Sequence, residues 1–117
     1  MAHDSQQRIS LHPHDRRVQV WIDDTLIADS QRAIELHEKG YPPRQYLPRE
    51  DVAMSRLVRT DTVTHCPFKG DASYYAIELD GKTVNDIAWS YEAPFDTVMD
   101  IRGYLAFDTT KLEQRLD

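Results

Sequence analysis

Short runs in which apolar and polar residues alternate cover much of the chain, and they predict strands rather than helices. Val18, Val20 and Ile22 occupy every second position, which places their side chains on one face of an extended segment. Two aspartates follow at residues 23–24, where their side chains can accept hydrogen bonds from nearby backbone amides, and residues 26–28 are again apolar. The pattern therefore predicts a β-hairpin here.

A second hairpin is predicted around Asp80-Gly81, the strongest local signal in the chain. This dipeptide separates two alternating runs, residues 71–79 and residues 82–89. It fits a two-residue type I′ turn, in which both turn residues have positive φ. A turn closed at this point pairs residue 73 with about residue 88. The aromatic residues that end the second run are therefore expected to return to the neighbourhood of Ser73.

Helical turns are predicted at three places between the extended runs. Pro48 supplies a helix-compatible φ, and the acidic residues that follow suit the positive end of a helix, so a short helix is predicted at residues 48–54. Residues 95–99 are interpreted as a second helical segment. Residues 109–116 are interpreted as a C-terminal helical turn capped by Thr109 or Thr110. The other extended runs are residues 9–11, residues 33–37 with Ile34 and Leu36 directed inward, residues 45–47 and residues 104–107.

The number and length of these segments indicate the fold class. Seven or so short strands bounded by turn residues, with almost no long segment of helical period, are typical of a mainly antiparallel β protein. A chain of 117 residues holds one core. Residues 8–117 are therefore predicted to form a single compact domain of antiparallel hairpins, with a twisted, barrel-like or multi-sheet β structure and one or two short helices. Residues 1–7 are polar and are predicted to be a mobile tail.

Composition and charge narrow the classes of partner. The chain has 14 basic and 20 acidic residues, a net charge of −6, so its overall field repels a phosphate backbone and no nucleic-acid partner is expected. No signal-peptide pattern opens the chain, and no apolar run approaches the length of a membrane span. We therefore expect a cytoplasmic protein without a membrane partner.

The single cysteine, Cys66, excludes an internal disulfide and a cysteine-rich zinc site. A metal site made from His65, Cys66, Asp71 and a fourth group lacks the paired spacing that such sites usually show. No glycine-rich dinucleotide fingerprint or phosphate-binding loop occurs in the sequence. Neither a metal nor a cofactor is therefore predicted.

Reactive side chains concentrate in one stretch, just before and within the predicted strand at residues 71–79. Pro67 and Gly70 interrupt this stretch, and loops of this kind commonly carry catalytic and binding residues. We therefore take the stretch as the candidate site. Its imidazole, thiol, ammonium, carboxylate and hydroxyl groups belong to His65, Cys66, Lys69, Asp71 and Ser73.

Four segments of the chain carry a family resemblance: Tyr46–Val52, Thr64–Tyr74, Ala88–Tyr91 and Gly103–Phe107. From about Arg16 to Phe107 the sequence resembles the domain of unknown function family numbered 427. The resemblance implies a small, mostly β single domain, widespread in bacteria, with no established reaction. It also implies a set of signature residues, which are Arg49, His65, Cys66, Lys69, Gly70, Asp71 and Trp89 in this sequence.

Cys66 has two interpretations. As a nucleophile it needs a nearby cation to favour the thiolate. His65 is adjacent, but consecutive residues of a strand point to opposite faces, which makes Lys69 the better electrostatic candidate. Cys66 is otherwise a buried structural cysteine that behaves as a small hydrophobic residue.

Two functions from different classes follow. In the first, the protein is an enzyme acting on a small anionic molecule, with Cys66, Asp71 and His65 in covalent or proton-transfer roles. Arg49 and Lys69 then hold the negative charge in one pocket. In the second, the protein is a non-catalytic domain that uses the same pocket to bind a small molecule or an interaction partner. Both functions are compatible with a homodimer. The other residues predicted to contact the ligand are Tyr46, Ser73, Trp89 and Tyr91.

Overall fold

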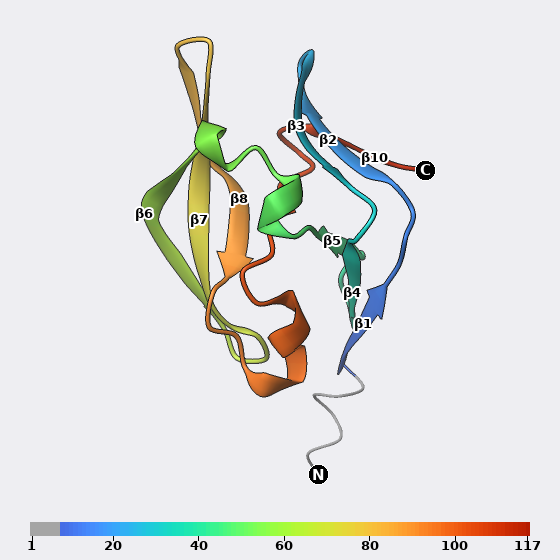
Figure 1. Cartoon of the computed structure of the whole chain (residues 1–117). Helices are drawn as coiled ribbons and strands as arrows, with labels where there is room; N and C mark the ends of the chain where they lie inside the picture. Colours follow the sequence, from blue (N-terminus) through green and yellow to red (C-terminus); the bar gives the residue numbers. More distant parts are fainter. Residues whose placement is uncertain (1–7) are drawn as a thin grey trace.

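Three antiparallel sheets and a few short helical turns make up the computed structural model, which describes residues 8–117 (Figure 1). The mainly β, multi-sheet fold expected from the sequence is confirmed, whereas the expected tail at residues 1–7 lies outside the described residues. The strands are β1 (Ile9–Pro13), β2 (Val18–Ile22), β3 (Thr25–Ser30), β4 (Ile34–Glu38), β5 (Arg44–Tyr46), β6 (Leu57–Cys66), β7 (Gly70–Leu79), β8 (Lys82–Tyr91), β9 (Ala106–Phe107) and β10 (Glu113–Leu116).

The sheets have the strand orders β1-β4-β5, β10-β2-β3 and β6-β7-β8-β9. In Figure 1 the long strands β6, β7 and β8 form one side of the molecule, and the two three-stranded sheets form the other. The short helical turns at residues 49–51 and 96–101 lie between the two sides, and the turn at residues 54–56 lies at the ends of β6 and β7. Strands distant in sequence therefore face one another across the interior.

The hairpin predicted from the first alternating run is confirmed. Val18 and Val20 of β2 are fully buried, and Ile22 is nearly so. Asp23 has φ of 51°, which the tight connection to β3 requires. The apolar face of this hairpin packs into one of two core clusters, together with Ile77, Ile87, Leu105 and Phe107.

The turn of the second hairpin is also confirmed. Asp80 and Gly81 both have positive φ, 52° and 76°, and Leu79 pairs with Lys82. Farther along, the register is shifted by two residues from the expectation, because Ser73 pairs with Ser90, but Trp89 and Tyr91 return to the neighbourhood of Ser73 as expected.

Bulges explain the altered register. Residues 85–87 of β8 stand opposite the single residue Ala76, since Ile77 pairs with Val84 and Tyr75 pairs with Ala88. Asp86 has φ of 54°, a left-handed conformation that an alternating pattern does not signal. In β6, residues 60–62 similarly stand opposite Tyr74.

Asp86 connects the two bulges. Its carboxylate accepts hydrogen bonds from the hydroxyl groups of Thr60, at 2.7 Å, and Thr62, at 2.8 Å. These bonds hold the pKa of Asp86 below its usual value. The carboxylate therefore stabilises the irregular parts of β6 and β8 against each other.

The C-terminal helical turn predicted at residues 109–116 is wrong for most of its length. Residues 113–116 form β10, which pairs with β2 so that Glu113 lies opposite Trp21 and Leu116 opposite Val18. The free edge of β2 supplies backbone hydrogen bonds that a short isolated helix would lack. Before β10, Asp108 accepts hydrogen bonds from the amide and the hydroxyl of Thr110, which closes a local turn.

The other predicted helices are 3-10 turns: η1 (Arg49–Asp51), η2 (Met54–Arg56) and η3 (Asp96–Ile101). Turn η3 contributes Val98 and Ile101 to the second core cluster, with Leu36, Tyr46 and Tyr91. None of the helices within residues 8–117 has the length and apolar character needed to cross a membrane.

Candidate functional site

The pairing of β6 with β7 divides the predicted site residues between two faces of one sheet. His65 pairs with Asp71, and Cys66 pairs with Gly70. Because side chains alternate along a strand, His65 and Asp71 lie on one face and Cys66 lies on the other. The sequence places these residues side by side, and the sheet separates them.

A cleft of about 580 Å³ lies on the Cys66 face, between β4–β5 and β6–β8. Five residues predicted from the sequence line it: Tyr46, Cys66, Lys69, Trp89 and Tyr91. The structure adds Leu36, Glu38, Tyr41, Pro42, Arg44, Thr64, Tyr74, Asp86 and Asp108 to its walls.

Aromatic rings line the middle of the cleft and hold one another in place. Trp89 Nε1 donates a hydrogen bond to the Tyr46 hydroxyl at 3.2 Å, and the rings of Trp89 and Tyr74 lie 6.3 Å apart. The Tyr74 hydroxyl lies 3.0 Å from Thr64 Oγ1. Burial raises the pKa of Tyr46 to about 12, so its hydroxyl stays protonated at neutral pH. These contacts make the wall rigid and give it hydrogen-bonding groups at fixed positions.

One end of the cleft contains an ion pair that is largely withdrawn from solvent. The Lys69 ammonium donates a hydrogen bond to Glu38, and the two side chains are only 10% and 11% exposed. Lys69 Nζ also lies 5.8 Å from the centre of the Tyr91 ring. The positive charge of Lys69 is therefore already paired within the protein.

The other end of the cleft carries Arg44, Asp86 and Asp108. The guanidinium of Arg44 lies 5.3 Å from the centre of the Trp89 ring. Hydrogen bonds from Thr110 lower the pKa of Asp108, and the positive charges of Lys111, whose Nζ lies 3.8 Å from Asp108 Oδ2, and of Arg44 contribute to this shift. Both aspartates are therefore ionised at neutral pH, as the lowered pKa of Asp86 also indicates.

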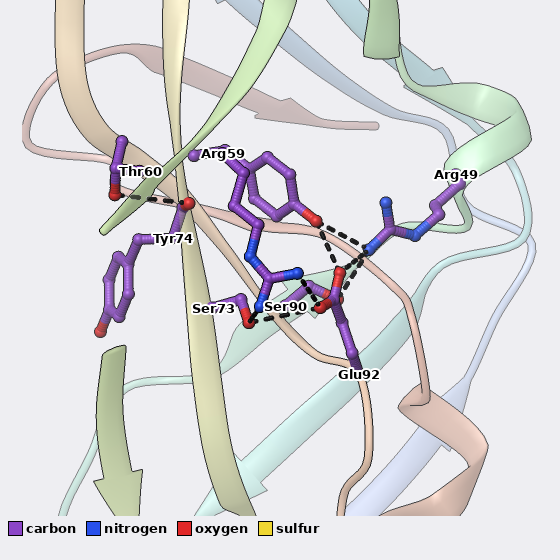
Figure 2. Close-up of polar contacts among 8 residues, drawn as sticks. Arg49, Arg59, Thr60, Ser73, Tyr74, Ser90 and Glu92 are labelled. Carbon is purple, nitrogen blue, oxygen red and sulfur yellow. Dashed lines mark hydrogen bonds and ion pairs between the residues drawn. The ribbon is translucent and has the colours of Figure 1, made fainter. Parts of the chain in front are cut away.

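The opposite face of the sheet carries a cluster centred on Glu92 (Figure 2). Arg49 Nη2 donates to Glu92 Oε2 at 2.7 Å, and the Tyr75 hydroxyl donates to the same oxygen at 2.6 Å. Arg59 Nη1 lies 3.0 Å from Glu92 Oε1, and Ser73 Oγ donates to that oxygen at 3.3 Å. Figure 2 shows Glu92 between the two arginines, which approach from different elements, η1 and β6.

The environment of Glu92 favours its charged form. Burial acts to raise the pKa of this carboxyl, but the hydrogen bond from Tyr75 and the charges of Arg59 and Arg49 outweigh it. The net result is a pKa below the usual value for glutamate. The cluster is thus an ionised carboxylate surrounded by donors, and it fastens η1 to the sheet.

A smaller hollow of about 370 Å³ adjoins the Glu92 cluster and is lined by His65, Asp71 and Ser73, among other residues. His65 Nδ1 lies 2.7 Å from Asp71 Oδ1, and these side chains are 63% and 71% exposed. His65 and Asp71 are therefore together, as the sequence suggested, but in an exposed pair away from Cys66.

The structure does not bring Arg49 and Lys69 into one pocket. Arg49 is bound in the Glu92 cluster, and Lys69 lines the cleft with Glu38. The residues that sequence reasoning missed are Glu38, Arg44, Arg59 and Glu92. Each contacts a partner at least 17 positions away in sequence, and no local pattern signals such pairs.

Residues 8–117 contain no group of three or more His, Cys, Asp or Glu side chains arranged to hold a metal ion.

The chain belongs to the family described as Domain of unknown function (DUF427), whose model matches residues 10–117. This confirms the resemblance found in the sequence. The match runs from β1 through β10 and so contains both the cleft and the Glu92 cluster. No curated protein matches the chain at a significant level.

Proposed function

For this member of the DUF427 family, we propose that the function is to bind a small organic molecule in the cleft between β4–β5 and β6–β8. The observation that carries the proposal is the aromatic lining of the cleft, from Tyr41, Tyr46, Tyr74, Trp89 and Tyr91. Ligand sites are typically concave, of about 300–1,000 Å³, with apolar and aromatic walls and a few fixed polar groups. The cleft, at about 580 Å³, has this character.

The ion pair at one end of the cleft supports a binding role. Two charges withdrawn from water in the wall of a cavity rarely stabilise a protein more than apolar residues of the same size would. Lys69 and Glu38 nevertheless occupy this position. The pair gives this end of the cleft a fixed polar group beside the aromatic walls, as ligand sites usually have.

The contacts of Cys66 favour binding over covalent catalysis. Of the two cations expected to activate the thiol, His65 lies on the opposite face of the sheet and Lys69 donates to Glu38. A nucleophilic cysteine usually has a base or a free cation directed at its sulfur. Cys66 instead contributes a partly buried sulfur to an aromatic wall, where it packs with the second core cluster.

A ligand screen tests this function. Purified protein is screened against a metabolite library by thermal shift, because any ligand that prefers the native state raises the unfolding midpoint. Hits are then measured on Trp89→Leu and on the matched variant Trp21→Leu, whose indole lies on β2 and does not line the cleft. We expect the hits to lose their shift only in Trp89→Leu. A screen without hits, or hits that both variants retain, would overturn the proposal.

A further inference from the structure

Arg44 is the cation of the cleft wall that has no ion-pair partner within residues 8–117. Its guanidinium lies against the Trp89 ring, at 5.3 Å from the ring centre. A guanidinium stacked on an aromatic face keeps its N–H donors in its own plane, where they remain free to bind a second group. A carboxylate fits this fork with two parallel hydrogen bonds.

The charge balance of the cleft disfavours a strongly anionic ligand. Its walls carry two cations, Arg44 and Lys69, and three carboxylates, Glu38, Asp86 and Asp108, which is a net charge of −1. Lys69 and Glu38 neutralise each other. Asp108 is paired with Lys111, whose Nζ lies 3.8 Å from Asp108 Oδ2. What remains for a ligand within residues 8–117 is one cation without an ion-pair partner, Arg44, and one such carboxylate, Asp86, which gives a doubly charged phosphate no net positive charge to bind.

We propose that the cleft binds a small zwitterion of the amino-acid type, with its carboxylate on Arg44, its ammonium toward Asp86, and its apolar body against Trp89 and Tyr74. This assignment rests on the proposed function and names its class of ligand. Arg44 and Asp86 line the same cleft, and the Trp89 ring against which Arg44 lies belongs to the same strand as Asp86. The two ends of a compact zwitterion can therefore reach both residues.

The Trp89–Tyr74 pair explains why the ligand should have an apolar body. The two rings lie 6.3 Å apart at a tilt of 39°, so together they form an angled apolar wall beside Arg44. Contacts between aromatic rings prefer such tilted or offset arrangements. An aromatic side chain on the ligand would extend this wall.

Three probes of nearly equal size test the contributions of the two charged groups of the ligand separately. L-phenylalanine carries both charged groups, 3-phenylpropanoate lacks the ammonium, and 2-phenylethylamine lacks the carboxylate. Binding is measured on ¹⁵N-labelled full-length protein from the indole N–H signals, which Trp89→Phe assigns. We expect L-phenylalanine to shift the Trp89 signal. Each of the other two probes should bind at least about 10-fold more weakly than L-phenylalanine, because each leaves one charged group of the cleft wall unpaired.

Arg44→Gln tests the contact between the Arg44 guanidinium and the ligand carboxylate. Arg56→Gln, at an exposed position of turn η2, is the matched control. Arg44→Gln should weaken the binding of L-phenylalanine at least about 10-fold and leave the binding of 2-phenylethylamine unchanged. Arg56→Gln should alter the binding of neither probe. Equal binding of L-phenylalanine to Arg44→Gln and the wild type would overturn the proposal. So would 3-phenylpropanoate binding as tightly as L-phenylalanine, or the absence of binding by L-phenylalanine, L-tryptophan and L-leucine. In each of these cases, library hits that depend on Trp89 would still sustain the cleft as a binding site.

Discussion

The two faces of the sheet β6-β7-β8-β9 carry polar groups that are paired to very different extents. On one face, Glu92 accepts hydrogen bonds from Arg49, Tyr75 and Ser73 and forms an ion pair with Arg59. On the other face, the cleft has aromatic walls and a guanidinium, Arg44, with no ion-pair partner within residues 8–117. Both faces are built by the same strands.

The difference indicates a division of roles. A carboxylate with four donors around it has little capacity left for a ligand and acts mainly to hold η1 against the sheet. A cation without an ion-pair partner in a cleft can instead donate its hydrogen bonds to a bound molecule. Lys69 and Glu38 form an exception on the cleft side, because they are mutually paired and largely buried.

The largest effect is expected from breaking the Lys69–Glu38 pair. Lys69→Met leaves the Glu38 carboxylate without its cation in a nearly buried position. The free energy of unfolding should fall by about 3 kcal/mol in urea titrations. The double variant Glu38→Leu with Lys69→Met removes both charges and should recover most of this loss. A double variant no more stable than the single one would contradict the expectation.

A smaller loss is expected on the other face. Glu92→Gln removes the negative charge that pairs with Arg49 and Arg59 and accepts a hydrogen bond from Tyr75. The free energy of unfolding should therefore fall by roughly 2 kcal/mol. Glu78→Gln, at an exposed position of the neighbouring strand, serves as the control and should change it by less than about 0.5 kcal/mol. Similar values for the two variants would mean that the Glu92 cluster does not hold η1 in place.

The pH dependence of stability sharpens the same comparison. The pKa of Glu92 is lower in the folded protein than in the unfolded chain, so between the two values the unfolded state binds more protons. The contribution of Glu92 is therefore complete above about pH 4.3, the ordinary glutamate pKa, and is lost as the pH falls through the folded value. Unfolding free energies measured from pH 7 to pH 3 should decrease more steeply for the wild type than for Glu92→Gln. Parallel curves would argue against an ionised Glu92.

The hairpin turn determines which side chains reach each face, and Gly81 controls that turn. Its φ of 76° is unfavourable for a β-branched residue, and no atom lies within 4 Å of an added Cβ, so the cost comes from the backbone alone. Gly81→Val should lower the free energy of unfolding by about 1 kcal/mol. Lys82→Val, at the first position of β8, should be close to neutral. If Gly81→Val is also neutral, the left-handed turn is not required.

The smallest effect is expected at Cys66. His65 and Cys66 are adjacent in the sequence but lie on opposite faces of the sheet. The rate of iodoacetamide alkylation of native protein should therefore change by no more than about twofold in His65→Ala. A rate reduced many-fold at constant pH would place the imidazole beside the sulfur and revive the catalytic interpretation.

Local patterns in the sequence were sufficient to predict most of the strands and turns, whereas β6 was not predicted and β10 was predicted to be helical. Val18, Val20 and Ile22 alternate because one face of β2 is buried, and Asp80-Gly81 adopts positive φ because the chain reverses in two residues. These features depend on neighbouring residues only, so a single sequence contains them. The grouping of Tyr46, Cys66, Lys69, Trp89 and Tyr91 in one cleft was also anticipated, because they belong to the segments that carry the family resemblance.

The tertiary structure alone decided which charges meet. The bulges at residues 60–62 and 85–87 move the register by two residues, and their stability depends on the contact of Asp86 with Thr60 and Thr62 across the sheet. The partners of Lys69 and Arg49 are Glu38 and Glu92, which lie 31 and 43 positions away in the sequence. An ion pair of this kind forms only after the sheets have packed, because the chain has no local preference that brings the two residues together.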